Sequence, residues 1–418
     1  MPLTIIQSLI ERFSCKRRLK KIYKLPTHNI TLNLIDRRVV DIINHLKKNG
    51  FEAYLVGGCI RDLLLKRSPK DFDVVTNAKP RQIKKIFRNS RIIGRRFRLV
   101  HIFAGKKIIE VSTFRGTDKL LSSQNSFAAN NVWGTMETDA FRRDFTVNSL
   151  YYDISNSTVI DYVNGMKDIK AKKLKSINDP FKTFEEDPVR IIRAARFSAM
   201  LELSLGEKEI ESAKKHSFLL AKVNPSRMLE ELRKILKCGA SAKTFFILNS
   251  TGALNYWLSE ITPAEIFDGT LKRLEILDRY INIHSMNEEL IFTVFLYELL
   301  KSVTGKEGTK SYQESFVLLR QKFRELAQKL HLPRWLWFGI CDIASTQHSF
   351  RRLSESYKPY RLLRRIVNGK YYQDSILFLE MENELNKNLN NLISFWKRTE
   401  EKIKKSQIQH KYYHQNIV

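Results

Sequence analysis

Two aspartates separated by one residue, Asp71 and Asp73, are the part of the sequence best suited to chemistry. Residues i and i+2 of a β-strand face the same side, so both carboxylates are expected to project together while Phe72 turns toward the core. Two neighbouring carboxylates repel each other unless a cation lies between them, and oxygen ligands suit Mg²⁺. The pair therefore predicts a site for two Mg²⁺ ions that could activate an attacking hydroxyl and stabilise a leaving pyrophosphate.

A glycine pair, Gly57 and Gly58, precedes Asp71 by some thirteen residues. Glycines allow backbone amides to approach a phosphate closely, and Arg61 could neutralise its charge. Either motif alone would usually be a turn or a solvated strand edge. Together, in a predicted strand–turn–helix–strand context, they favour a phosphate site beside a metal site.

A third carboxylate is expected from a neighbouring strand, and the sequence offers two candidates. Glu110 lies among apolar residues of a predicted strand, where a charge is costly unless it is paired or bound to metal. Its alternative interpretation is an exposed strand face. Asp144, in the stretch Phe-Arg-Arg-Asp-Phe, is the competing candidate, and the choice stays open.

The elements that would position these residues form a mixed α/β unit. Alternating and helical apolar patterns predict strands at 53–56, 72–75, 98–103, 108–114, 149–153 and 158–163, and helices at 34–46, 61–66 and 80–87. After about residue 187 the pattern becomes helical, with helices expected at 186–201, 225–237, 242–248, 290–300 and 315–330. The predicted fold class is α+β, a small mixed-sheet head followed by an all-helical neck and body. The expected divisions are a basic arm at 1–30, the head at 31–160, the neck at 161–250 and the body at 251–418.

Composition restricts the setting in which this chain works. The 418 residues carry a formal net charge of +29, which favours a polyanionic partner such as RNA but does not separate an enzyme from a passive binder. A Lys-rich solvated surface is the alternative interpretation. No uninterrupted apolar run long enough to span a membrane occurs, and the four cysteines lack metal-finger spacing. A reducing, cytoplasmic location is expected.

Six stretches resemble the class II nucleotidyltransferases, the family of bacterial poly(A) polymerases and of CCA-adding enzymes. They are LVGGCIRDLLL, KDFDVVTNAKP, IIEVSTFRG, FRRDFTVNSLYYD, DYVNGMKDIKAKKL and EEDPVRIIRAARFSAML, in that order between about residues 54 and 203. The resemblance implies that Asp71 and Asp73 hold the metals and that Asp144 or Glu110 completes the catalytic set. It implies nucleotide-binding roles for Gly57, Gly58, Arg61, Arg143, Asp144, Asn148, Asp187, Arg190, Arg193 and Arg196.

Within that set, the resemblance implies that Asp187 and Arg190 read the base edge. Their spacing of three would put both on one helix face, where a carboxylate and a guanidinium offer acceptors and donors to a base. Arg193 and Arg196 continue the row and could guide phosphate or RNA. The alternative is an ordinary helical ion-pair ladder, which would be preferred without the upstream motifs.

The expected activity is template-independent transfer of AMP from ATP to RNA 3′ ends. The stretch RIIGRRFRLVHI at 91–102 resembles the form found in bacterial poly(A) polymerases, while CCA addition to tRNA is the runner-up. A non-catalytic RNA-binding protein on the same scaffold is a second alternative.

Two basic clusters are candidates for RNA backbone contacts. They are Arg95, Arg96 and Arg98, and, interleaved with aromatic residues, Arg351, Arg352, Arg364 and Arg365; the second cluster could equally be a solvated helical face with its aromatics in the core.

Overall fold

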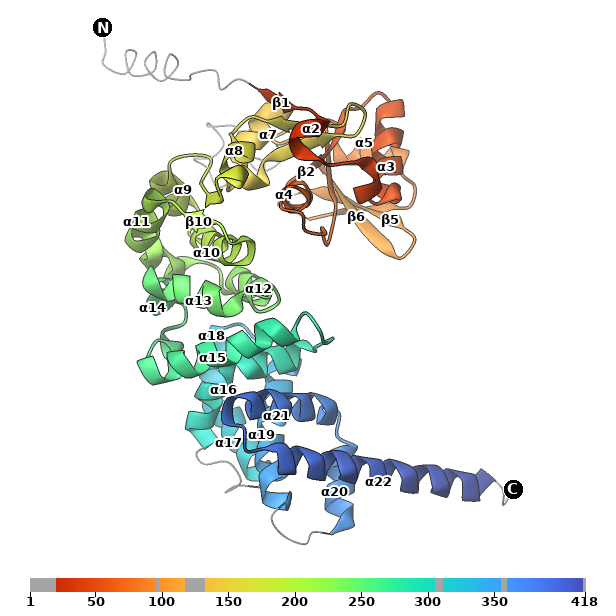
Figure 1. The fold of residues 1–418 in the computed structure, drawn as a ribbon, viewed down its shortest axis with the longest axis vertical. Helices are drawn as coiled ribbons and strands as arrows, with labels where there is room; N and C mark the ends of the chain where they lie inside the picture. The colour runs from red at the N-terminus through yellow and green to blue at the C-terminus, as the bar shows by residue number, and fades with distance from the viewer. Residues whose placement is uncertain (1–19, 95–97, 117–131, 305–310, 355–358, 416–418) are drawn as a thin grey trace. The chain divides into compact units, whose positions relative to one another are not determined.

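The computed structural model describes residues 20–94, 98–116, 132–304, 311–354 and 359–415. The chain divides into two compact units, Met1–Glu186 with Leu203–Ser212, and Asp187–Glu202 with Ala213–Val418. We call the first the head and the second the helical unit, and describe each by itself (Figure 1). None of the helices in the described ranges combines the length and apolarity that a membrane crossing requires.

The head is built on a mixed sheet, which within the described residues has eight strands in the order β1-β8-β7-β2-β3-β6-β5-β4. Only β3 and β6 pair in parallel, and every other neighbouring pair is antiparallel. The strands are β1 Lys21–Tyr23, β2 Ala53–Val56, β3 Asp73–Thr76, β4 Ser90–Ile93, β5 Leu99–Ala104, β6 Lys107–Thr113, β7 Leu150–Asp153 and β8 Thr158–Asp161. A separate parallel pair joins β9 Lys173–Leu174 to β10 Ser204–Leu205.

The centre of the sheet is apolar on both faces, which explains why its strands contain β-branched runs. Val74 and Val75 of β3 are fully buried, and Val75 belongs to a core cluster with Val56, Phe114 and Tyr151. Strand β3 therefore has neighbours on both sides and a fixed register. This anchors Asp73, its first residue, at the edge of the core.

Helices of the head flank these strands. Helix α3 (Arg37–Lys48) is capped by Asp36, whose carboxylate accepts a hydrogen bond from the Arg38 amide, and it ends before Gly50, which has a φ of 82°. The other helices of the head are α2 Leu25–His28, α4 Gly58–Leu64, α5 Pro80–Ile86, α7 Met136–Arg142, α8 Gly165–Lys170, α9 Pro180–Glu186 and the 3₁₀ helices Leu32–Leu34 and Thr146–Asn148.

The helical unit is packed around aromatic residues. Trp396 donates its indole N–H to the Phe350 carbonyl at 3.0 Å, and the Tyr372 hydroxyl donates to the Trp396 carbonyl at 2.9 Å. Its helices are α10 Val189–Leu201, α11 Glu207–His216 (which begins in the head), α12 Pro225–Leu236, α13 Ser241–Ser250, α14 Ala253–Trp257, α15 Ala264–Tyr280, α16 Glu288–Thr304, α17 Tyr312–Lys322, α18 Arg324–Lys329, α19 Arg334–Ser354, α20 Tyr360–Val367, α21 Tyr372–Asn386, α22 Asn390–Gln415 and the 3₁₀ helices Ser217–Lys222 and Ser259–Ile261.

The predicted fold class, a mixed-sheet head followed by helices, is confirmed, with differences in detail. Residues 21–30 of the expected basic arm belong to the head, because β1 pairs with β8 and Ile30 is buried. Strand β4 was not predicted. The helix expected over 186–201 is interrupted, since α9 ends at Glu186 and α10 begins at Val189. Pro188 explains the break, because a proline disfavours helical geometry in the residue before it.

Candidate active site

The carboxylates that open β3 and lie along β6 form the centre of the site. Asp73 is the first residue of β3, whereas Asp71 lies just before the strand, so the prediction that both are strand residues is wrong for Asp71. Val74 is opposite Val111 in the parallel pairing of β3 and β6. The preceding residues of the two strands, Asp73 and Glu110, are therefore neighbours across the sheet.

The electrostatics of Asp73 confirm that these carboxylates affect one another. Lost hydration, repulsion from Glu110 and a smaller repulsion from Asp71 raise the pKa of Asp73 to about 6, although Arg143 opposes the change. The Asp73 side chain is nevertheless exposed to solvent, as is Asp71. The adjoining Cys59 thiol is buried, and burial together with the Asp73 charge raises its pKa to about 12, so it stays protonated.

These carboxylates fit a divalent cation in their chemistry, because a cation would relieve the repulsion that raises the pKa of Asp73. Within the described ranges, no group of three or more His, Cys, Asp or Glu side chains is close enough to hold a metal.

Glu110 is more accessible than its apolar neighbours suggested. Its side chain is 52% exposed, and its Oε1 lies 3.4 Å from His101 Nε2 across the β5–β6 pairing. The expectation that this charge must bear a burial cost is therefore wrong. The strand alternates, and Glu110 lies on the exposed face between buried Ile109 and Val111.

The glycine turn brings two guanidinium groups to the start of α4. Gly57 has a φ of 80°, a conformation that favours glycine, and its amide donates to the Leu150 carbonyl at 3.1 Å. A Cβ on Gly57 would lie 3.3 Å from Arg143 Nη1, and one on Gly58 would lie 3.3 Å from Arg61 Nη2. Both positions are therefore close to positive charge, as a phosphate site requires.

Arg61 is buried and is held by a chain of polar contacts. Its Nη1 donates to Asn148 Oδ1 at 2.6 Å, and its Nη2 lies 2.7 Å from Asp62 Oδ1. Asn148 Nδ2 in turn donates to Asp144 Oδ1 at 3.1 Å, which also accepts the Phe145 amide at 2.8 Å. Asp144 therefore accepts the amide of Phe145, which precedes the short 3₁₀ helix, and orients Asn148.

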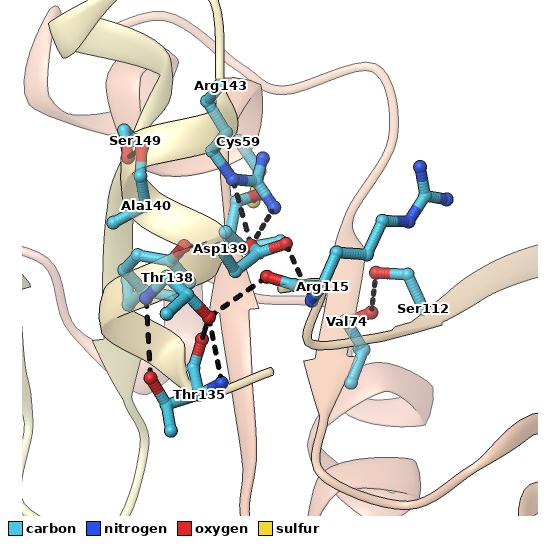
Figure 2. A network of polar contacts seen from close by, with 12 residues as sticks. Cys59, Val74, Ser112, Arg115, Thr135, Thr138, Asp139, Ala140, Arg143 and Ser149 are labelled. Carbon is cyan, nitrogen blue, oxygen red and sulfur yellow. Dashed lines mark hydrogen bonds and ion pairs between the residues drawn. The ribbon is translucent and has the colours of Figure 1, made fainter. Parts of the chain in front are cut away.

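Arg143 is positioned by Asp139, a residue that the sequence interpretation missed (Figure 2). Asp139 Oδ2 accepts from Arg143 Nε at 3.2 Å and Nη2 at 3.0 Å and from the Tyr151 hydroxyl at 2.8 Å, and Oδ1 accepts the Arg115 amide at 3.3 Å. Burial and the Asp139 charge raise the pKa of Tyr151, so its hydroxyl remains a donor. The spacing of four residues between Asp139 and Arg143 on a helix was the available signal.

In the helical unit, Asp187 precedes α10 and does not share a continuous helix with Arg190, which corrects the predicted placement. The two still interact, because Asp187 Oδ2 lies 3.8 Å from Arg190 Nε. Arg227 of α12, which was not predicted, lies closer, with its Nη2 2.7 Å from the same oxygen. Asp187 Oδ1 is buried and has no hydrogen-bond partner among the described residues.

Arg193 and Arg196 face Glu231, a buried residue of α12. Arg193 Nη1 lies 3.7 Å from Glu231 Oε1, and Arg196 Nη2 lies 3.6 Å from Glu231 Oε2. Lys234 Nζ completes the group at 2.9 Å from Oε1. Arg196 is itself buried over the Phe197 ring, at 4.4 Å from its centroid. These contacts agree with the ion-pair alternative for Arg196.

The predicted RNA-binding arginines differ in their surroundings. Arg95 and Arg96 lie outside the described residues, while Arg98 is exposed. Arg352 of α19 and Arg365 of α20 line one pocket of about 400 Å³; Arg351 is half-buried on α19 and Arg364 is exposed on α20. Of the interleaved aromatics, Phe350 and Tyr372 are buried in the core, as the alternative interpretation expected.

Comparison with known proteins agrees with this geometry. A family model for the poly A polymerase head domain matches residues 53–175, and a model described as the probable RNA and SrmB-binding site of polymerase A matches residues 204–265. Poly(A) polymerase I of Haemophilus influenzae is 44% identical over 345 residues, covering 78% of this chain and 76% of the relative. Poly(A) polymerase I of Escherichia coli O157:H7 is 35% identical over 390 residues, covering 88% and 83%.

A solved structure shares the fold at low sequence identity. The Bacillus stearothermophilus CCA-adding enzyme in complex with CTP superposes with a TM-score of 0.61 at 22% identity, covering 88% of this chain and 81% of that one. These matches agree with the structural features described above, namely the mixed sheet, the glycine turn and the aspartate at the start of β3. The chain belongs to the poly(A) polymerase family of nucleotidyltransferases, which also contains the CCA-adding enzymes.

Proposed function

We propose that this protein transfers AMP from ATP to the 3′ end of RNA and releases pyrophosphate. The observation that carries the proposal is the gathering of Asp71, Asp73 and Glu110 beside a glycine turn flanked by Arg61 and Arg143. Carboxylates beside a cationic phosphate cradle suit phosphoryl transfer, in which positioning and charge stabilisation supply most of the catalysis.

Asp71 and Asp73 would hold two Mg²⁺ ions, with Glu110 as the third catalytic carboxylate. When bound, such ions lower the pKa of an attacking hydroxyl and neutralise charge on the leaving pyrophosphate. Glu110 is preferred over Asp144, because Asp144 Oδ1 already accepts hydrogen bonds from the Phe145 amide and from Asn148. Asp144 and Asn148 would then act on the nucleotide through Arg61.

The triphosphate would lie against the Gly57–Gly58 turn. Arg61 and Arg143 are fixed in advance by Asn148 and Asp139, so little side-chain freedom is lost when they bind phosphate. No covalent enzyme intermediate is required. The 3′ hydroxyl of RNA loses its proton to solvent and its oxygen bonds to the α-phosphorus of ATP, the bond from that phosphorus to the oxygen bridging the α- and β-phosphates breaks, and pyrophosphate leaves.

Asp187 and Arg190 would select the base. The Asp187 carboxylate, whose side chain is 24% exposed, can accept a hydrogen bond from an exocyclic amine such as N6 of adenine. Arg190, held near Asp187 Oδ2, can donate to a ring nitrogen. We expect Arg190→Ala to reduce discrimination among the four nucleotides, and unchanged discrimination would refute the role.

RNA would be held by contacts between arginine side chains and its phosphate backbone. We assign this role to Arg95, Arg96, Arg98, Arg351, Arg352, Arg364 and Arg365, with Arg193 and Arg196 next to the base-reading pair. The three cysteines within the described residues are free thiols, which fits our placement of the protein in the reducing cytoplasm.

The deciding experiment offers all four nucleotides and Mg²⁺ with two acceptors, a generic single-stranded RNA and a tRNA lacking its 3′ end. An adenylate homopolymer on the generic RNA supports our proposal. Addition of C, C and A to the tRNA alone would establish the runner-up, CCA addition.

Asp71→Asn and Asp73→Asn are the catalytic controls, and we expect each to lose about 10³-fold or more in rate while RNA affinity stays close to wild type. RNA binding without incorporation by the unaltered chain would leave only a binding protein.

A further inference from the structure

A second basic site lies in the helical unit, away from the arginines singled out in the sequence. Helices α17, α18 and α19 surround a hollow of about 760 Å³. We call it the arginine hollow and define it by Arg320, Arg324, Arg334, Trp337 and Phe338. Its volume lies in the range of roughly 300–1,000 Å³ that is usual for ligand sites.

The charge in the hollow is uncompensated. Arg320, Arg324 and Arg334 are all exposed, and no aspartate or glutamate is among the described residues that line the hollow. Across the described parts of the chain, no ion pair joins any of these three arginines to a carboxylate. Three guanidinium groups around one concavity repel one another, and an anion placed between them relieves that repulsion.

Aromatic rings line the hollow beside these charges. The Phe338 centroid lies 4.3 Å from Arg320 Cζ and 5.1 Å from Arg334 Cζ, and Trp337 contacts it edge-on at 4.8 Å. A guanidinium stacked on a ring keeps its N–H donors in its own plane, where they remain available to phosphate oxygens. Trp337 and Phe338 are only half-buried, so part of each ring remains accessible.

We propose that the arginine hollow binds one or two nucleotides of single-stranded RNA, with phosphates on the arginines and a base stacked on Trp337. The inference rests on the proposed function, because it assigns a contact for the RNA that receives the nucleotide. Stacking and phosphate contacts do not read base edges, so the hollow would accept RNA without regard to sequence. A recess lined by aromatic rings suits an inserted base better than a flat lipid surface does.

The test uses the full chain and fluorescence anisotropy with a labelled single-stranded RNA of about twenty adenylates, without ATP or Mg²⁺. Two charge-removing variants, Arg320→Gln with Arg324→Gln together and Arg334→Gln alone, are compared with Lys322→Gln. Lys322 is exposed at the end of α17 and does not line the hollow, so it controls for loss of charge. Trp337→Leu removes the stacking surface, and thermal unfolding of each variant checks that it is folded.

We expect the double variant to bind RNA about tenfold more weakly at 0.1 M KCl. The slope of log affinity against log salt should also become less steep by about 1.4, because each phosphate contact on a single strand contributes about 0.7. Trp337→Leu should weaken binding by about fivefold or more with little change in slope, because stacking carries no charge. Lys322→Gln should change affinity by less than about twofold.

Three outcomes overturn the inference. One is wild-type RNA affinity in the hollow variants, another is an equal loss in Lys322→Gln, and the third is lost binding to phosphatidylglycerol vesicles with unchanged RNA affinity. The result is separable from the proposed function. If the unaltered chain transfers no AMP but the hollow variants still lose RNA affinity, the hollow remains an RNA site and only the transferase proposal fails.

Discussion

At the scale of single residues, the raised pKa of Asp73 has a consequence for stability. Its pKa is about 6 in the folded protein and 3.8 in a model peptide, so the folded state binds this proton more tightly than the unfolded chain does. The cost of the charge is therefore fully present above about pH 6 and disappears as the pH falls below about 4. Removing the charge should therefore stabilise the metal-free protein above about pH 6 and have little effect below about pH 4.

We therefore predict that Asp73→Asn abolishes transfer but raises the unfolding free energy of the metal-free protein by about 1 kcal/mol at about pH 8. The full shift would correspond to about 3 kcal/mol, and solvent exposure of the side chain reduces it. Denaturant unfolding at about pH 8 and pH 4 measures the effect. Asp41→Asn, on the exposed face of α3, is the matched control. A gain that persists at pH 4 would contradict this explanation.

Asp139 carries a second residue-scale prediction. Its buried carboxylate accepts hydrogen bonds from Arg143 and Tyr151, so Asp139→Asn leaves a guanidinium with a weaker partner. We expect a loss of about 2–4 kcal/mol in unfolding free energy and a raised KM for ATP. Glu137→Gln, exposed on the same helix, should change neither quantity appreciably.

These residues also mark what the sequence could predict about the site. The glycine turn, Arg61 and Asp73 were identified because their types and order carry chemical information on their own. Asp139 was missed because its importance comes from burial beside Tyr151, a contact that depends on packing between α7 and β7.

At the scale of elements, Glu231 joins α10 to α12. Three cations approach its buried carboxylate, so Glu231→Gln should destabilise the helical unit by about 3 kcal/mol, since it removes a negative charge that faces buried Arg196. Glu230, its neighbour, is 58% exposed and pairs with Arg233 on the surface. Glu230→Gln should therefore cost less than about 1 kcal/mol in the same unfolding measurement. Similar losses in both variants would show that the buried ion pairs contribute little.

The elements that sequence patterns predicted well are those whose own residues determine them. The strands around Val74 and Val75 are β-branched and buried on both faces, and α3 has an aspartate cap and a glycine stop. The helix break before α10 was missed although Pro188 indicates it, because apolar periodicity continued across the proline. Strand β4 was missed because its pairing with β5 determines it more than its short, half-polar sequence does.

At the scale of the whole molecule, the net charge of +29 sets how RNA binding responds to salt. Each phosphate neutralised on a single strand releases condensed counterions, so log affinity should fall linearly with log salt, with a slope steeper than about −2. Titrations between about 0.05 and 0.3 M KCl measure the slope. ATP affinity, set by the fixed contacts of the head, should change much less. An RNA affinity that does not change with salt would mean that the excess positive charge lies away from the bound strand.

The short strand β1 also bears on how the isolated chain behaves in concentrated solution. It pairs with β8 at one border of the sheet, and it is only three residues long, contains Lys21 and is soon followed by Pro26. Short, charged strands next to proline are poor templates for further pairing. A truncation that begins after Tyr23 would uncover the backbone donors and acceptors of β8 beside Val159 and Ile160, and cross-chain aggregation would follow. An affinity tag should therefore be added before β1 and should not replace that strand.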